Sequence, residues 1–493
     1  MRYFFLFFLF FSFKAVAQIK YDANWIIGYN TPATPKLDGV LINFLNDTAF
    51  SMPLENSMNF SSYAASISDK NGRLFASTNG CYINNKNNTT MYKGDSINYG
   101  YYYNINCTGN SYGYKGYQGN LFLPNSLDTN LFHLLHIIQY YKKDYKYSHY
   151  SGALLETIID KSLDNGLGGV ISKNKIVLED TLTQGQLTTT KHANGKDWWI
   201  ILPQNETNGY HQLLFTEKGI TKKQFQNIGA ISVDEDWAGQ AVFTPDGKHY
   251  ARADPNNLLK VFDFDRCLGR FFNPRSIKVD TAEMSCNGVA FSPNSRFLYV
   301  TTGEKLYQFD IKATDLEKSR VLIDTFDGFK NSLWTTFYMC QLAMNNQIYI
   351  GSNNGVKSLH TIHLPDSLGK KCDFKQHDLQ LPAQYFVGIP HFPNYRLGAS
   401  DVVCPTVAEE NLPVPFEVRL FPNPVAQALT IEVPNSNSPT ALTLYNSLGQ
   451  VVYTATVPPE GIAKIDVRHY PSGLYFCALQ QGMMRVVKKV VIE

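Results

Sequence analysis

The chain has 493 residues, and because single domains usually hold roughly 100 to 200 residues, we expect at least two folded units. Charged residues make up only 17% and aromatic residues 14% of the chain, which excludes an intrinsically disordered protein. The formal net charge is +2, without a long block of one sign. A nucleic-acid partner is therefore not expected.

The N-terminal residues 1–17 have the order of a secretory signal peptide. Arg2 precedes an apolar run over residues 3–11, and the small-x-small triplet at residues 15–17 comes before Gln18. The run is shorter than the roughly 20 residues of a membrane-spanning helix, so cleavage is favoured over an uncleaved anchor. Residues 131–141 are also apolar, but two His and one Gln interrupt them. We predict export, with no transmembrane segment in the mature chain.

Eight cysteines are spread along the chain without a CxxC pair or a Cys/His cluster of zinc spacing. A metal site is therefore not expected. Export would allow disulfides to form, and we expect one or two of them. Cys267 with Cys286 and Cys372 with Cys404 are the candidate pairs, and several other cysteines fit small apolar core positions.

A strand-and-turn unit repeats in the middle of the chain. In residues 240–265 a short strand ends at Phe243, the triplet Pro-Asp-Gly turns the chain, and two further strands follow. The same pattern returns in residues 288–310, where Phe291 lies 48 positions after Phe243. Weaker copies are found at residues 65–80, 119–141, 191–214 and 342–359.

Each of these units is too small to bury both of its faces alone. A period of roughly 40 to 50 residues built of short strands is typical of propeller blades packed around a centre. Residues 18–398 therefore predict a closed β-propeller of about seven blades, and the fold class is all-β. We expect the opening strand at 24–29 to pair near 387–395 and so close the ring. A β-sandwich or a β-helix is the alternative.

Several segments of this region resemble known propeller repeats. PDGK after Phe243 and SPNSR after Phe291 resemble the turns of WD40-like and TolB-like propellers. Residues 78–85, 261–271, 288–300 and 391–398 are similar to a family of secreted propeller proteins that end in a sorting domain. That family is defined by its architecture, so the resemblance implies no catalytic residues.

Residues 399–416 contain three prolines and no periodicity, as a linker would. Residues 417–493 then show seven short alternating strands, which predict a small Ig-like antiparallel β-sandwich. The seven predicted strands are 417–421, 429–433, 441–445, 451–455, 463–467, 474–479 and 485–492.

This C-terminal segment resembles a known family. The ordered motifs LFPNPVAQALTI, LTLYNSLGQVVY, PSGLYFCAL and VVKKVVIE are similar to the C-terminal sorting domain of type IX (Por) secretion substrates. The resemblance implies that the outer-membrane secretion machinery is a partner, and that the domain is removed at release or surface attachment. Residues 422–424 would form its first turn and Gly449 a hairpin turn. The pattern alone also fits an Ig-like accessory module.

The search for catalytic motifs finds weak candidates. Residues 109–113 match GxSxG, but no α/β-hydrolase pattern surrounds them, so a loop is favoured. The cluster Asp234, Glu235 and Asp236 precedes Trp237 and could serve a glycosidase. Because neighbouring side chains alternate on a strand, we interpret it as a solvated turn.

Single histidines and aspartates add little to this picture. His192, His211 and His391 could act as general bases, but lone histidines among aromatic strands are more often structural. Asp263 and Asp265 alternate with core-facing phenylalanines, and no calcium-loop spacing is present. We therefore predict no catalytic, cofactor-binding or metal-binding residue and no cofactor.

Residues 98–120 are rich in Tyr, Asn and Gly. Tyrosine is common where proteins bind sugars or other proteins, although a self-packed loop is the alternative. The sequence thus predicts an extracellular or surface-attached propeller that acts as a binding or scaffold protein, with a possible glycan or protein ligand. The alternatives are a carbohydrate-active propeller enzyme and a structural surface-layer component.

Overall fold

The computed structural model describes residues 19–31, 37–45, 47–55, 58–108, 113–143, 149–232, 239–254, 258–280, 287–402, 404, 418–434, 440–447, 449–459, 461–481 and 484–493. The predicted signal peptide lies outside these residues. The chain divides into two compact units, Met1–Cys404 and Pro405–Glu493. Each unit is described by itself.

The first unit consists of antiparallel sheets that follow one another along the chain, and we number them 1 to 7. Sheets 1 and 2 have three strands and sheets 3 to 7 have four. Sheet 1 contains β1 (Asn24–Thr31), β2 (Leu37–Asn43) and β3 (Phe50–Leu54), and sheet 2 contains β4 (Ala65–Ser68), β5 (Leu74–Thr78) and β6 (Ile83–Asn85). Sheet 3 contains β7 (Asn120–Pro124), β8 (Leu131–Tyr141), β9 (His149–Asp160) and β10 (Gly169–Leu182), and sheet 4 contains β11 (Thr188–Lys191), β12 (Trp198–Pro203), β13 (Gly209–Thr216) and β14 (Gly219–Asn227). Sheet 5 contains β15 (Ala241–Phe243), β16 (His249–Asp254), β17 (Leu258–Asp265) and β18 (Arg270–Lys278), sheet 6 contains β19 (Gly288–Phe291), β20 (Phe297–Thr301), β21 (Lys305–Asp310) and β22 (Val321–Thr325), and sheet 7 contains β25 (Cys340–Leu342), β26 (Ile348–Ile350), β27 (Val356–Ile362) and β28 (Phe374–Tyr385).

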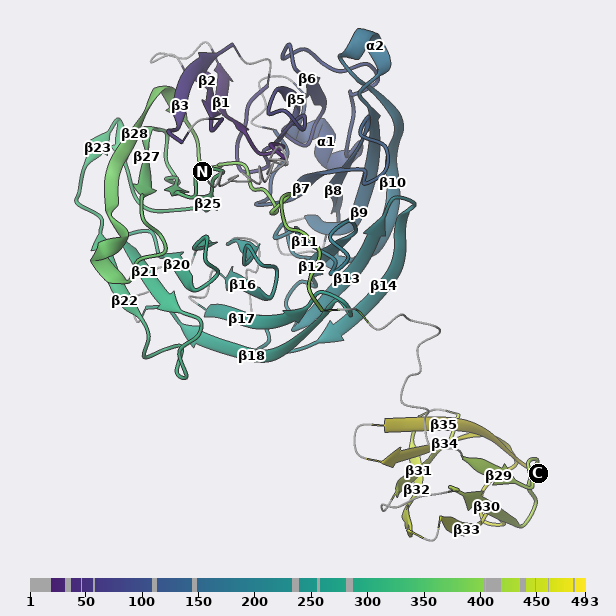
Figure 1. Cartoon of the computed structure of the whole chain (residues 1–493). Helices are drawn as coiled ribbons and strands as arrows, with labels where there is room; N and C mark the ends of the chain where they lie inside the picture. The colour runs from purple at the N-terminus through teal and green to yellow at the C-terminus, as the bar shows by residue number, and fades with distance from the viewer. Residues whose placement is uncertain are drawn as a thin grey trace, which may run out of the picture. The chain divides into compact units, whose positions relative to one another are not determined.

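These sheets stand around a common centre, with β10, β14, β18 and β22 on the outside (Figure 1). The remaining elements are short: the hairpin β23 (Lys330–Asn331) and β24 (Leu333–Trp334), the helices α1 (Tyr101–Asn106) and α2 (Leu163–Gly166), and the 3-10 turn η1 (Gly369–Cys372). The predicted all-β propeller architecture is confirmed. Seven sheets in the described residues agree with the expected number of blades.

The repeat seen in the sequence is a repeated hydrogen-bonded turn. In sheet 5 the Thr244 hydroxyl contacts the Asp246 carboxylate at 2.6 Å and accepts the His249 amide at 3.0 Å. In sheet 6 the Ser292 hydroxyl contacts Asn294 at 2.7 Å and accepts the Phe297 amide at 2.9 Å. A hydroxyl followed two positions later by a short polar side chain thus closes both turns in the same way.

The start of the propeller differs from the prediction. Strand β1 pairs with β2 in its own sheet, with Trp25 opposite Ile42, rather than with residues 387–395. The expected strand pairing is therefore wrong, because β1 finds its hydrogen-bond partners in the hairpin that follows it directly. Sheets 1 and 7 nevertheless share one hydrophobic core, in which Trp25 and Val40 lie with Tyr349 and Leu359.

Alternation along β17 is confirmed. Phe262 and Phe264 are buried in the core of sheets 4 and 5, while Asp263 binds Arg275 at 2.8 Å on the other side of the strand. Asp265 accepts the backbone amides of the following turn. These two aspartates therefore act as structural hydrogen-bond acceptors.

The apolar residues 131–141 form strand β8, and most of them are buried. His133 lies 2.9 Å from Glu156, and His136 contacts Asn98 at 2.6 Å. Both histidines are thus structural, as the sequence suggested for lone histidines. In the part of the chain that the structure describes, no helix has the length and apolarity to cross a bilayer.

The second unit is a two-sheet β-sandwich. One sheet has the order β29 (Arg419–Phe421), β30 (Ala428–Glu432), β33 (Ile462–Asp466), and the other β32 (Val451–Val457), β31 (Thr440–Tyr445), β34 (Gly473–Gln481), β35 (Met484–Ile492). Each of the seven predicted strands overlaps one of these. Leu429 and Ile465 of the first sheet pack with Leu442, Leu479 and Val490 of the second in a core of their own.

Both predicted turns of this unit are present. Asn423 accepts the Val491 amide at 2.8 Å and donates to the Lys489 carbonyl at 2.8 Å, so the first turn holds strand β35. Gly449 has φ of 78°, and its amide donates to the Asn446 carbonyl in the hairpin between β31 and β32.

The disulfides differ from both candidate pairs. Cys81 bonds to Cys107, and Cys267 bonds to Cys404 over a sequence separation of 137. Cys372 is free and buried, as are Cys340 and Cys477, and Cys286 lies outside the described residues. The expected number of disulfides, one or two, is confirmed for the described residues. Which cysteines pair depends on which distant segments the fold brings together, and the spacing of cysteines along the sequence does not reveal this.

Candidate functional site

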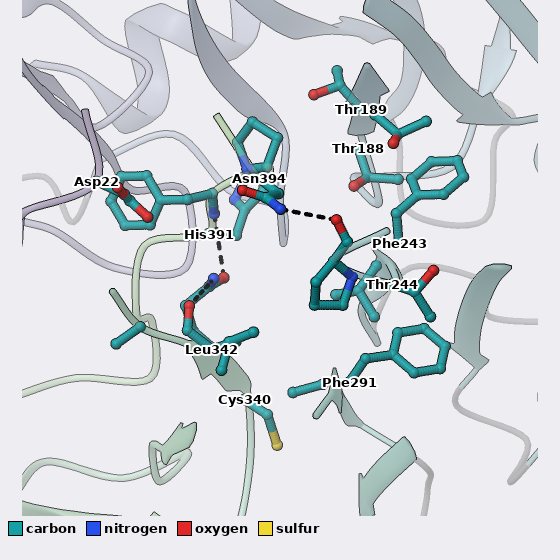
Figure 2. Close-up of a pocket in the computed structure, with 18 of the residues that line it drawn as sticks. Asp22, Thr188, Thr189, Phe243, Thr244, Phe291, Cys340, Leu342, His391 and Asn394 are labelled. Atoms are coloured by element: carbon teal, nitrogen blue, oxygen red, sulfur yellow. Dashed lines mark hydrogen bonds between the residues drawn. The ribbon is translucent and has the colours of Figure 1, made fainter. Parts of the chain in front are cut away.

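A pocket of about 310 Å³ lies where the first strands of sheets 4 to 7 meet. Figure 2 shows its lining side chains converging from these strands and from a segment near the end of the propeller. Strands β11, β15, β19 and β25 are each the first strand of their sheets, and the turns that follow β15, β19 and β25 also reach the pocket. Pro245 and Pro293 line it from two of these turns.

Buried glutamines hold the inner strands around the pocket. Gln118 accepts the Ala241 amide at 2.7 Å and donates to the Ala241 carbonyl at 3.1 Å. Gln240 accepts the Cys340 and Val289 amides at 2.7 Å and 3.1 Å. An amide side chain offers both a donor and an acceptor, so it can satisfy backbone groups of neighbouring sheets that share no ladder.

The segment 386–400, which we call the strap, crosses from sheet 7 to sheet 4. Asn394 donates to the Pro245 carbonyl at 2.8 Å, and Tyr395 donates to the Phe122 carbonyl at 2.8 Å. At its end, Ser400 donates its amide to the Ala193 carbonyl, and the disulfide from Cys404 to Cys267 follows. The first residues of the predicted linker 399–416 are therefore held against the propeller.

The strap is joined to the start of the chain by an ion pair. The two guanidinium nitrogens of Arg396 lie 2.6 Å and 2.8 Å from the two carboxylate oxygens of Asp22. Asp22 is 5% and Arg396 23% exposed at the side chain. This two-pronged contact is a strong form of the interaction, and it lies in the pocket wall.

We expect Arg396→Met to lower the free energy of unfolding by about 1 to 3 kcal/mol, since it leaves a buried carboxylate without its cation. Thermal or urea unfolding measures this change. The double variant Asp22→Asn with Arg396→Met should recover part of the loss, because both charges are then gone. Equal stability of the single variant and the wild type would contradict the structural role of the pair.

Uncharged polar groups and aromatic rings make up most of the pocket lining. Thr188, Thr190 and Thr244 supply hydroxyl groups, and amides come from several glutamines and asparagines. The lining aromatic residues are Phe243, Phe291 and Phe392. Asp22 is the sole carboxylate among the described lining residues, and Arg396 neutralises it. The pocket therefore offers hydrogen bonds and apolar surface with no net charge.

His391 belongs to this neutral wall. Its side chain is buried, and burial lowers its pKa to about 4, so the imidazole is uncharged at neutral pH. Its Nε2 atom has no hydrogen-bond partner among the described residues. Cys340 also lines the pocket, and burial raises the pKa of its thiol, which keeps it protonated and unreactive.

The other histidines considered from the sequence lie elsewhere. His211 contacts Asp180 at 2.6 Å, and His192 accepts an amide within its own turn. Neither lines the pocket. The acidic cluster 234–236 with Trp237, and residues 109–112 of the GxSxG match, lie outside the described residues.

The hydroxyls of β11 and the strap are functional features that no sequence motif marked in advance. Thr188 and Thr190 stand in a run of three threonines before the turn of a repeat copy. Once a propeller was predicted, the residues just before each repeated turn could have been assigned to the ring centre. The strap was recognised only as a resemblance over residues 391–398, and no local pattern shows that it folds back over the pocket.

The C-terminal unit can be compared with a known family. Residues 419–493 match the secretion system C-terminal sorting domain. The second unit is a sorting domain of this kind. Its match covers all seven strands of the sandwich described above. A sorting domain of the type IX (Por) system indicates a secreted or cell-surface protein that the type IX machinery handles.

Solved structures with distant likeness to this chain are also found. A search of curated proteins found no match. A protein from Lactobacillus plantarum is 12% identical, with 75% of this chain and 98% of that chain covered and a TM-score of 0.43. A putative 6-phosphogluconolactonase from Bacteroides fragilis is 12% identical, with 75% and 98% covered and a TM-score of 0.42.

The β-propeller domain of Cps50 (Swd1) from Myceliophteria thermophila is 10% identical, with 68% of this chain and 91% of that chain covered and a TM-score of 0.37. These scores are too low to support a conclusion about this chain.

Proposed function

We propose that this protein is an extracellular or cell-surface binding protein, whose propeller the type IX machinery exports and whose central pocket binds a small neutral ligand rich in hydroxyl or amide groups. In this proposal residues 1–17 are a signal peptide, 18–398 the propeller, 399–416 a linker that begins against the propeller, and 417–493 the sorting domain. The ring is closed through the core that sheets 1 and 7 share.

The observation that carries this proposal is the chemistry of the pocket lining. Hydroxyl and amide groups from sheets 4, 5 and 7 and from the strap surround aromatic rings, and the lone carboxylate among the described lining residues is paired with Arg396. A charged ligand would lose hydration without gaining an opposite charge, whereas a neutral polar ligand can exchange its water for these groups. The ligand class that fits best is therefore a neutral sugar.

The size of the pocket agrees with a small ligand. Ligand pockets in proteins span about 300 to 1,000 Å³, and this one has about 310 Å³. That volume suits one or two sugar rings rather than a long chain. Such a concave lining also favours a binding role over a purely structural surface-layer component, for which no pocket is needed.

The propeller-enzyme alternative has less support. Glycosidases generally use two carboxylates, one on each side of the scissile bond. Among the described residues that line the pocket, Asp22 is a single carboxylate, and its oxygens are taken by Arg396. His391, with a pKa of about 4, is a weak base. Apart from the paired Asp22, the described lining residues offer no carboxylic acid that could work with it.

The proposal predicts that Thr188→Val with Thr190→Val weakens ligand binding. Two hydroxyl donors or acceptors are removed at nearly constant volume, so affinity should fall about 10- to 100-fold. Isothermal titration calorimetry of the full chain with glucose, galactose, mannose, N-acetylglucosamine and cellobiose measures this affinity. Thr325→Val, exposed on β22 away from the pocket, is the matched control and should bind like the wild type.

Two results would overturn the pocket assignment. One is an absence of binding to every sugar in this set by the wild-type chain. The other is a bound sugar whose affinity does not change in the double threonine variant, because the ligand would then occupy another part of the molecule. Circular dichroism of each variant checks that the sheets are intact.

A further inference from the structure

A second hollow, which we call the tyrosine platform, lies beside α1. It has a volume of about 240 Å³. Helix α1 and the end of β8 supply most of its lining, and α1 packs against β8. The lining residues are Tyr101, Tyr102, Ile105, Asn106, Lys115, Tyr141 and His149.

Exposed aromatic rings form this surface. Tyr101 is 55% and Tyr141 46% exposed, although their ring centres are only 4.4 Å apart. Large aromatic side chains are usually buried, so two exposed rings side by side are uncommon at a site without a ligand. Their planes are inclined at 43°, so the two rings touch without stacking in parallel, and both border the hollow.

The support beneath the rings is rigid. Tyr102 is buried against Tyr114 with ring centres 5.3 Å apart, and the Cys81–Cys107 disulfide ties down the end of α1. The Tyr114 hydroxyl accepts the Gln139 amide of β8 at 2.7 Å. Exposed tyrosines on a fixed base lose little conformational entropy when they bind a ligand.

The platform is separate from the central pocket. The pocket is lined by turns between first and second strands, and in sheet 3 the equivalent turn ends at Leu131. Strand β8 then runs 11 residues to Tyr141, about 35 Å at roughly 3.3 Å per residue. Tyr141 and His149 therefore lie at the opposite end of the sheet from the turns that surround the pocket.

We infer that the tyrosine platform binds pyranose rings of a glycan chain. The C–H groups on one face of a pyranose are apolar and pack on tyrosine rings, while its hydroxyls need polar partners at the edge. The platform has both parts, because Asn106, Lys115 and His149 border the aromatic rings. The backbone of Lys115 is held by Gln139, whose amide donates to the Lys115 carbonyl at 2.7 Å.

The dimensions favour a glycan over a folded protein partner. A stable protein interface usually buries more than about 1,000 Å² in total, whereas this hollow of about 240 Å³ has the scale of single sugar rings. A glycan chain can place one ring on the platform and continue over the exposed surface. This inference stands on different residues from the proposed pocket ligand.

Affinity electrophoresis of the full chain tests the inference, with a soluble β-glucan in one gel and polygalacturonate in another. We expect at least one polysaccharide to retard the wild type, and the double variant Tyr101→Ala with Tyr141→Ala to bind at least 10-fold more weakly. Tyr101→Phe with Tyr141→Phe keeps the rings and should retain most of the binding. Tyr99→Ala is the matched control, since Tyr99 is 63% exposed in the same tract but does not line the platform.

The two gels separate a neutral from an acidic glycan, and retardation in either gel supports the inference. It is overturned if neither polysaccharide retards the wild type, or if the double alanine variant migrates like the wild type. The Thr188→Val and Thr190→Val changes should leave the retardation unaltered, so failure of the platform and failure of the pocket can be distinguished.

Discussion

Deletion of residues 419–493 should abolish the appearance of the protein outside the cell and leave the propeller in the periplasm. The deleted segment is the one that matches the secretion system C-terminal sorting domain. Immunoblots of medium, cell surface and periplasmic fractions measure the distribution. We expect the extracellular fraction to fall by more than 10-fold.

The deletion should not unfold the remaining chain. The core of the sorting domain is made of that domain's own side chains, so its removal takes no side chain from the propeller cores. The periplasmic product should therefore show a cooperative thermal transition, which is the control for misfolding. Undiminished export of the truncated chain would contradict the sorting assignment.

Gly247→Val should lower the free energy of unfolding of the propeller by about 2 to 5 kcal/mol, from left-handed backbone strain and from overpacking together. Gly247 has φ of 72°, a conformation that β-branched residues resist. A Cβ atom there would lie 2.6 Å from the Thr190 hydroxyl and 2.9 Å from Leu397 of the strap. The side chains of Thr190 and Leu397 would have to shift to make room.

Gly219→Val is the matched control for this substitution. Gly219 has a similar φ of 89°, but a Cβ there meets nothing within 4 Å, so its variant carries the backbone strain without the crowding. Thermal unfolding of both variants separates the two effects, and Gly247→Val should be clearly the less stable. Equal melting temperatures of the two would show that close packing around Gly247 is unimportant.

Much of the fold could be predicted because its signals are local. The repeated turns depend on a hydroxyl, a proline and a short polar side chain within six positions, as at Thr244 and Ser292. The seven strands of the sorting domain follow from alternation over five to nine residues each. In the propeller sheets, strands that follow one another along the chain pair with each other, so their pairing needs no long-range information. In the sorting domain, β30 pairs with β33 and β31 with β34, and these partners are not consecutive along the chain.

The candidate sites were predicted less well. The tyrosine tract was recognised from composition, but which rings are exposed depends on the packing of α1 against β8 and on the Cys81–Cys107 disulfide. For the pocket, His391 was considered from the sequence as a lone histidine. Thr188, Phe243 and Asp22 line the same pocket as His391, but each is more than 100 positions from it along the chain.

By itself, the amino-acid sequence determined the all-β class, the repeated blades and the C-terminal sorting sandwich, since each arises from residues that are close along the chain. Tertiary structure alone decided the Cys267–Cys404 disulfide, the course of the strap and the composition of the pocket. These contacts join Asp22 to Arg396 and Cys267 to Cys404, which are far apart along the chain. Such pairs depend on how the sheets are arranged around the centre, and a local pattern of residue types does not encode that arrangement.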